Sequence, residues 1–124
     1  MRGLVHCFYE DKAGTLWSGR NDGIYKFSTD RQQYTQLHLD LPEEKEKRIP
    51  ATVLYEDRQN VFWVGGTQGL FIFDRNQEKA TRASLPDSLA FRHVTTIIET
   101  PDEVLWIGFM GEGLARWDRK NNSF

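Results

Sequence analysis

In this 124-residue chain, the side chains that are best spaced for chemistry belong to three glutamates. Glu10, Glu56 and Glu99 occupy matching places in a repeated stretch of sequence, so together they could form a ring of carboxylates. Because these glutamates recur together with the repeat itself, we expect them instead to make hydrogen bonds at strand ends and turns.

Other residue types that support catalysis are present without a pattern. His6, His38 and His93 fall at unrelated places in their repeats and lack the spacing of metal ligands. No glycine-rich phosphate loop, nucleophile elbow or zinc motif is found. The single cysteine, Cys7, lies in an apolar stretch and is interpreted as a small buried hydrophobe. The sequence therefore predicts no catalytic residue, no metal site and no cofactor.

A tryptophan-centred motif occurs three times, and its spacing decides the expected fold. Trp17, Trp63 and Trp106 are 46 and 43 residues apart, and each is followed two residues later by a glycine. A period of this length indicates one supersecondary unit copied along the chain. We expect the tryptophans to pack between neighbouring sheets and the first glycines to let a neighbouring backbone approach. The repeated positions are Trp17, Gly19, Gly23, Trp63, Gly65, Gly69, Trp106, Gly108 and Gly113.

Each repeat can be divided into four short strands. The first strands are rich in β-branched and aromatic residues, the second contain the tryptophan, and the third follow the second glycine. The interval from glutamate to tryptophan is seven residues in all three copies, which fixes the register of the first hairpin. The predicted first strands are 5–11, 51–57 and 94–100, the third strands 24–27, 70–73 and 114–117, and the fourth strands 34–39 and 79–83.

The first turn of each repeat is expected to contain a residue with positive φ. Gly14 and Asn60 occupy this position in the first two repeats and tolerate that conformation. Glu103 occupies it in the third repeat and tolerates it poorly, so the third turn is predicted to differ. Asp11 and Asp57 are expected to cap their turns through the side chain.

The predicted fold class is therefore all-β: about three four-stranded antiparallel meanders, arranged as the blades of an incomplete β-propeller. The blades are expected at about 4–41, 50–85 and 92–124, and the last lacks most of its fourth strand. Propellers usually need at least four blades to close, and open strand edges favour pairing with another chain. We therefore expect the chain to be part of a longer array, and to self-associate if it folds alone.

The repeats resemble the two-component regulator propeller repeat. The best match is the run Leu105-Trp106-Ile107-Gly108, followed by Gly113-Leu114, and Asp11, Gly14 and Trp17 match the turn and strand. The departures from the pattern are Ser18, Arg20, Gly66 and Phe109. The resemblance implies a segment of the extracytoplasmic sensor region of bacterial hybrid histidine kinases or diguanylate cyclases. The resemblance also implies a periplasmic location. Several sensors of this kind respond to carbohydrate fragments, so it implies a small glycan or another small molecule as ligand.

Charge and hydropathy exclude several other classes. The net charge of −2 provides no basic surface for nucleic acid, and no apolar run is long enough for a membrane span. No signal peptide precedes the first repeat, which agrees with a piece of a larger receptor. The mixed charge run at 43–48 is interpreted as a solvated loop or a short helical turn.

A ligand is expected at the turns between second and third strands and at the links that enter the first strands. These segments open on one face of a four-stranded meander, and loops held by a rigid scaffold often carry function. The candidate ligand-binding residues are Arg20, Asn21, Asp22, Arg48, Thr67, Gln68, Arg92, His93, Phe109, Met110 and Glu112.

The leading functional hypothesis is a non-catalytic sensing module of a signalling receptor. A propeller scaffold that docks other proteins is the alternative. A propeller lyase, of the kind that opens streptogramin antibiotics, is less favoured because its histidine and acidic metal site has no counterpart here. The fold alone does not choose among these functions.

Overall fold

A computed structural model describes residues 4–28, 33–37, 50–111 and 113–124 of the chain. Throughout these residues the regular structure consists of β-strands, without a helix, in three antiparallel sheets. We call the sheets blades 1, 2 and 3 in chain order. Each is a meander in which consecutive strands are neighbours. The prediction of an all-β chain built from propeller-like blades is confirmed.

The strand boundaries agree with the predicted ones to within one or two residues. Blade 1 consists of β1 (Val5–Glu10), β2 (Leu16–Arg20), β3 (Gly23–Ser28) and β4 (Gln33–Leu37). Blade 2 consists of β5 (Ala51–Glu56), β6 (Phe62–Gly66), β7 (Gly69–Asp74) and β8 (Lys79–Arg82). Blade 3 consists of β9 (Val94–Thr100), β10 (Val104–Phe109) and β11 (Gly113–Asp118).

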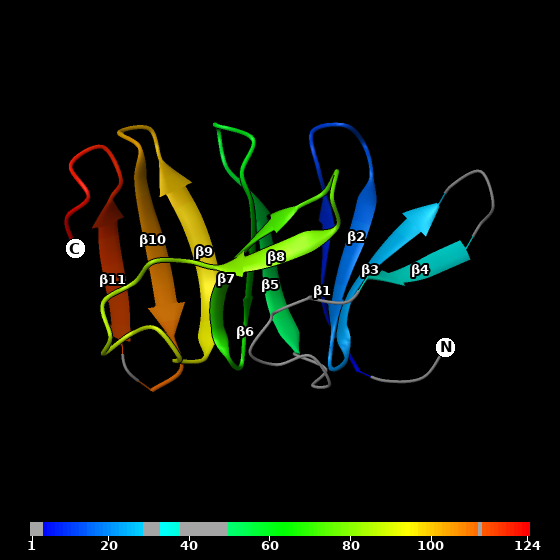
Figure 1. Cartoon of the computed structure of the whole chain (residues 1–124), viewed down its shortest axis with the longest axis horizontal. Coiled ribbons are helices and arrows are strands. Elements are labelled where there is room, and N and C mark those ends of the chain that lie inside the picture. Colours follow the sequence, from blue (N-terminus) through cyan, green and yellow to red (C-terminus); the bar gives the residue numbers. More distant parts are fainter. Residues whose placement is uncertain (1–3, 29–32, 38–49, 112) are drawn as a thin grey trace.

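The three blades stand side by side in chain order, with their first strands β1, β5 and β9 neighbouring one another (Figure 1). Each blade has a forward face, turned towards the next blade, and a back face, turned towards the preceding one. Trp17 on the forward face of blade 1 contacts the rings of Phe62 and Phe73 on the back face of blade 2, with centroids 5.1 and 6.0 Å away. Trp63 contacts Trp117 in the same way at 5.6 Å.

The core of the protein therefore lies between sheets. Trp17 and Trp63 are almost completely buried there, as predicted, because a following blade covers each of them. Trp106 remains half-buried because it lies on the forward face of blade 3, which no described residue covers.

The glycines that follow the first two tryptophans leave room for the next blade. A Cβ atom on Gly19 would lie 2.7 Å from the carbonyl oxygen of Ala51, and one on Gly65 would lie 2.6 Å from Cγ1 of Val94. Contacts this short would force the two blades apart. The predicted close approach of a neighbouring blade is thus confirmed at both junctions.

The third turn corrects one prediction. Glu103 adopts a φ of 66°, the same value as Asn60, and Gly14 has a φ of 86°. The amide of Glu103 donates to the backbone carbonyl of Thr100. The amides of Gly14 and Asn60 donate in the same way to the backbone carbonyls of Asp11 and Asp57. The hairpin register imposes the turn geometry, so a glutamate is held in the left-handed region despite its side chain.

Candidate functional site

The turns gather at two opposite edges of the blades (Figure 1). We call one the loop edge: it holds the second turns, at 20–23, 66–69 and 109–113, and the starts of the first strands. The other is the salt-bridge edge: it holds the first turns, at 11–15, 57–61 and 100–103, and the turn at 74–78. The predicted ligand-binding residues belong to the loop edge, whereas the recurring carboxylates belong to the salt-bridge edge.

On the loop edge, the second turn of blade 1 is bound to its own blade. The amide of Asn21 donates to the carbonyl of Leu4, and its side-chain oxygen lies 2.5 Å from Nε2 of His6. The hydroxyl of Tyr25 donates to the Asp22 carboxylate at 2.8 Å. Arg20 is buried, with its guanidinium 4.8 Å from the centroid of the Tyr25 ring. Asn21 and Asp22 are therefore held by contacts within their own blade, and Arg20 is buried against the Tyr25 ring.

The second turn of blade 2 is tied to the link that leads into blade 3. Nη1 of Arg82 donates to the carbonyl of Gln68 at 2.6 Å and to that of Ala90 at 3.2 Å. The side chains of Thr67 and Gln68 are half-buried at this turn. Arg82 thus holds the backbones of two predicted ligand-binding segments near each other.

Blade 3 joins its second turn to the start of its first strand. The amide of Met110 donates to the carbonyl of His93 at 3.0 Å, and Nε of Arg92 donates to the carbonyl of Ser88. Met110 is exposed, whereas Phe109 is buried. The other predicted ligand-binding residues, Arg48 and Glu112, and also His38, lie outside the described residues.

On the salt-bridge edge, Asp11 and Asp57 cap the first turns as predicted. Oδ1 of Asp11 accepts the amides of Ala13 and Thr15 at 3.0 and 2.9 Å, and its Oδ2 accepts Nε1 of Trp17 at 2.9 Å. Asp57 repeats this arrangement with Gln59, Val61 and Trp63. Each aspartate therefore fixes both a turn and the orientation of the tryptophan that packs on the next blade.

The recurring glutamates make turn hydrogen bonds, but across blades. Oε1 of Glu56 accepts the amide of Lys12 in blade 1 at 2.7 Å, and Oε1 of Glu99 accepts the amide of Arg58 in blade 2 at 2.9 Å. Each glutamate thus caps the first turn of the preceding blade. Glu10 has no described blade before it and is exposed.

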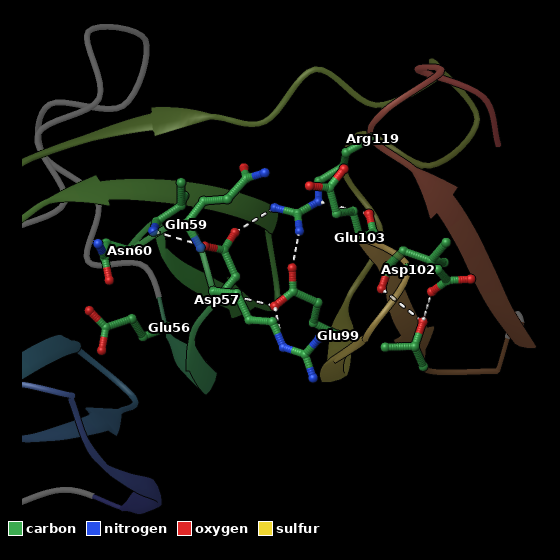
Figure 2. A network of polar contacts seen from close by, with 12 residues as sticks. Glu56, Asp57, Gln59, Asn60, Glu99, Asp102, Glu103 and Arg119 are labelled. Atoms are coloured by element: carbon green, nitrogen blue, oxygen red, sulfur yellow. Dashed lines mark hydrogen bonds and ion pairs between the residues drawn. The ribbon is translucent and has the colours of Figure 1, made fainter.

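Two arginines that sequence reasoning missed complete the junctions. Arg75 donates to Asp11 of blade 1 at 3.0 Å and to Glu56 of its own blade at 2.7 Å. Arg119 bridges Asp57 and Glu99 in the same manner, as Figure 2 shows. Both arginines directly follow the aspartate that ends a third strand, and this shared offset is the signal that could have revealed them.

These contacts keep the aspartates ionised. Burial raises the pKa of Asp11, but hydrogen bonds from Trp17 and Thr15, together with Arg75, outweigh burial and hold the pKa below its usual value. The pKa of Asp57 is lowered in the same way, with Arg119 as the cationic partner. These two aspartates are therefore ionised and have their hydrogen-bonding capacity filled, which suits a structural role.

Blade 3 departs from this pattern on its forward face. Thr100 replaces the capping aspartate, and its hydroxyl accepts Nε1 of Trp106 at 3.2 Å. Pro101 follows it and has no amide proton that a glutamate of a further blade could accept. This face is therefore not equipped for a third copy of the arginine bridge.

A cleft of ≈ 740 Å³ lies beside the bridge of Arg75, between blades 1 and 2. It is lined by charged, polar and apolar groups, among them Lys12, Lys26, Asn76 and Phe73. The cleft is on the salt-bridge edge, opposite the predicted ligand-binding loops. Within the ranges that the structure describes, no cluster of three potential metal ligands occurs, and no helix is long and apolar enough to cross a membrane.

Comparison with known proteins identifies the fold. No protein-family model matches the chain, and no curated protein matches it. Among solved structures, the extracellular domain of a B. thetaiotaomicron protein described as a hybrid two-component system is 21% identical, with a TM-score of 0.67. The match covers 92% of this chain and 15% of that one.

A second extracellular domain from B. thetaiotaomicron gives the same result. It is described once as a one-component and once as a hybrid two-component system, and its two structures have TM-scores of 0.75 and 0.73 at 16% identity. Each match covers 96% of this chain and 18% of the other. The chain thus has the fold of a part of these extracellular domains and spans less than a fifth of their length.

Proposed function

We propose that this chain is a non-catalytic, ligand-sensing segment of an extracytoplasmic receptor in a bacterial two-component system. The observation that carries the proposal is the structural match over 92–96% of the chain to extracellular domains of such systems. The repeated tryptophan motif points to the same class of receptor. Output by a kinase or cyclase would belong to other parts of the receptor.

The proposed ligand is a small glycan, and the proposed binding surface is the loop edge. Its second turns differ in residue type from blade to blade while the scaffold beneath them is constant. Variable side chains on fixed turns suit recognition of a particular ligand. Binding would favour one arrangement of blades over another, and this requires a difference in affinity between the two states.

A thermal-shift screen with oligosaccharides tests this proposal. A glycan that binds only the folded form at 100 times its dissociation constant stabilises by about 2.7 kcal/mol, which raises the melting temperature by several degrees. Gln68→Ala and His93→Ala on the loop edge are expected to abolish that shift. Asn76→Ala is the matched control, because Asn76 is an exposed turn residue in the cleft on the opposite edge.

Two results would contradict the proposal. No response to any sugar would favour the alternative, a scaffold that docks proteins. A shift abolished by Asn76→Ala but retained by the loop-edge variants would move the binding site to the cleft. The coding sequence beside this segment supplies an independent check, because the proposed receptor also requires a membrane span and a signalling domain.

A further inference from the structure

An exposed aromatic ring lies in the link that runs from β8 to β9 (Figure 1). This ring belongs to Phe91, which is 64% exposed and comes three residues before β9. The link spans one of the two closed junctions, by which we mean the contact of blade 1 with blade 2 and that of blade 2 with blade 3. Phe91 is not among the ligand-binding residues predicted from the sequence. Single exposed apolar residues are common on proteins, so its role depends on the contacts that it makes.

Arg82 connects the exposed ring to the core of blade 2. The centre of the Arg82 guanidinium lies 4.2 Å from the centroid of the Phe91 ring and 4.7 Å from that of the Phe71 ring. Phe71 is completely buried. Cation–π attraction holds a guanidinium over an aromatic ring. Arg82 therefore covers one face of the Phe91 ring, and an exposed fraction of 64% leaves the other face open to solvent.

A comparison with blade 1 indicates what the arginine adds. Gln36 in blade 1 and Arg82 in blade 2 occupy the same place in their fourth strands. The side-chain amide of Gln36 donates to a carbonyl of its second turn at 3.0 Å, and Nη1 of Arg82 donates to the matching carbonyl of Gln68 at 2.6 Å. Support of the second turn is thus common to both blades. The longer side chain of Arg82 also reaches the following link, at the carbonyl of Ala90 and the ring of Phe91.

The link is packed tightly against the second turn of blade 2. A Cβ atom on Gly69 would lie 2.5 Å from the carbonyl oxygen of Ala90. Within the link, the amide of Arg92 donates to the carbonyl of Leu89, and its Nε donates to that of Ser88. The exposed ring is therefore held in place before a ligand arrives. A group fixed in this way loses little conformational freedom on binding.

Polar side chains lie near the ring. Thr67 and Gln68 belong to the turn that Arg82 ties to the link, and both are half-buried. Their hydroxyl and amide groups can donate and accept hydrogen bonds. A flat apolar surface beside such groups matches a pyranose ring, which carries C–H groups on its faces and hydroxyl groups around its rim.

The geometry of stacking selects among sugars. An axial oxygen on a pyranose face keeps an aromatic ring away from the C–H groups of that face, and dispersion attraction weakens as atoms separate. β-Linked glucose units have no axial oxygen on either face. β-Linked galactose units have one face without an axial oxygen, whereas α-linked mannose units have an axial oxygen on each face. Glucose and galactose units of this kind can therefore stack closely, and the mannose units cannot.

We propose that the open face of Phe91 stacks on a pyranose unit of the glycan, and that this unit has a face free of axial oxygens. This inference rests on the proposed function, a glycan sensor that binds on the loop edge. It adds a residue that contacts the ligand and the class of sugar that this residue accepts. Arg82 acts as a positioning residue beneath the ring.

Isothermal titration calorimetry tests the class of sugar. The probes are cellotetraose, a β-1,4-linked galactotetraose and an α-1,2-linked mannotetraose. We expect the wild-type chain to bind one or both of the first two at least about tenfold more tightly than the mannotetraose.

Substitutions of Phe91 test the contact itself. Phe91→Ala is expected to weaken binding of the preferred glycan at least about tenfold, whereas Phe91→Trp keeps a flat aromatic face and should retain it. Phe124→Ala is the matched control, because Phe124 is 49% exposed and stacks on Trp117 at 5.1 Å, beside the salt-bridge edge. Melting temperatures without glycan measure whether each variant is folded like the wild type.

The outcomes separate this inference from the proposed function. Binding of none of the three glycans would contradict both. A glycan that binds wild type and Phe91→Ala equally would overturn the inference and leave the proposed function standing. The same holds for a preference for the mannotetraose, and for a folded Phe91→Trp variant that binds no better than Phe91→Ala. A loss in Phe124→Ala as large as that in Phe91→Ala would also overturn the inference.

Discussion

The salt-bridge edge and the loop edge differ in how far their residue types repeat from blade to blade. On the salt-bridge edge, an aspartate, a glutamate and an arginine recur at matching offsets at both closed junctions, and there each finds its partner inside the protein. On the loop edge, the three second turns differ: Asn21 and Asp22 in blade 1, Thr67 and Gln68 in blade 2, and Met110 in blade 3. The difference teaches that repetition in this chain marks groups that hold blades together, whereas variation falls on the edge where we propose that a ligand binds.

The two closed junctions also differ in depth. The side chain of Arg119 is 12% exposed and that of Arg75 is 23% exposed, while the carboxylates they bridge are 0–4% exposed at both junctions. A more deeply buried ion pair is less screened by water, and removing one of its partners costs more stability because the other charge stays buried and unpaired. The bridge between blades 2 and 3 should therefore matter more to stability.

Breaking the arginine bridges is expected to have the largest effect. Arg119→Met leaves Asp57 buried without its cation and Glu99 with only the exposed Arg58, whose Nε lies 4.0 Å away, and should lower the free energy of unfolding by about 3–5 kcal/mol. Arg75→Met should cost less, because Arg75 is more exposed to water. Urea unfolding of both variants measures the comparison. Equal losses, or a larger loss for Arg75→Met, would contradict the difference in depth.

Acid should weaken the same edge. Because the folded protein holds the pKa of Asp57 below its unfolded value, the folded state binds fewer protons and its stability rises with pH. The stabilisation is complete above about pH 4 and is lost as the pH falls through the lowered value. Melting temperature as a function of pH measures this loss. Asp57→Asn should flatten the curve at low pH, whereas Asp87→Asn, an exposed control of equal charge change, should not.

The fold was predictable because the repeat constrains it three times. The strand order, the hairpin registers, the burial of Trp17 and Trp63 and the turn capping by Asp11 and Asp57 follow from positions that recur. The role of Glu56 was predicted only in kind: its hydrogen bond at a turn was expected, but not that the turn belongs to the preceding blade. A sequence gives the offset of a residue within its own repeat, not which neighbour it reaches.

The arginine bridges were missed for the same reason. Arg75 contacts Asp11, and Arg119 contacts Asp57, over separations of 64 and 62 residues. Local hydrogen-bonding rules do not reach that far, and the third repeat, with Thr100, hides the pattern. The candidate ligand-binding residues were placed by topology alone, so the sequence predicted their shared edge but not that Arg20 and Phe109 are buried.

The strained third turn offers a smaller test of the salt-bridge edge. Glu103→Asn puts a residue that tolerates positive φ where Asn60 already stands in blade 2, and should stabilise the fold by about 0.5–1 kcal/mol. Gly14→Glu is the reciprocal change. It should lower the stability by a comparable amount. A Cβ at Gly14 meets no atom within 4 Å, so this loss would come from the strain of a positive φ and not from a steric clash. Thermal unfolding of both variants measures the two effects. A neutral result for both would show that the turn accepts either residue.

The smallest effect is expected on the loop edge. Thr67→Ala and Gln68→Ala should each change the free energy of unfolding by no more than about 0.5 kcal/mol, because Arg82 holds this turn through the backbone carbonyl of Gln68. The side chains can then be removed without releasing the turn. Urea unfolding measures this beside the arginine variants. Losses of stability as large as that of Arg119→Met would mean that the loop-edge side chains are structural. That result would contradict the proposal that they bind a ligand.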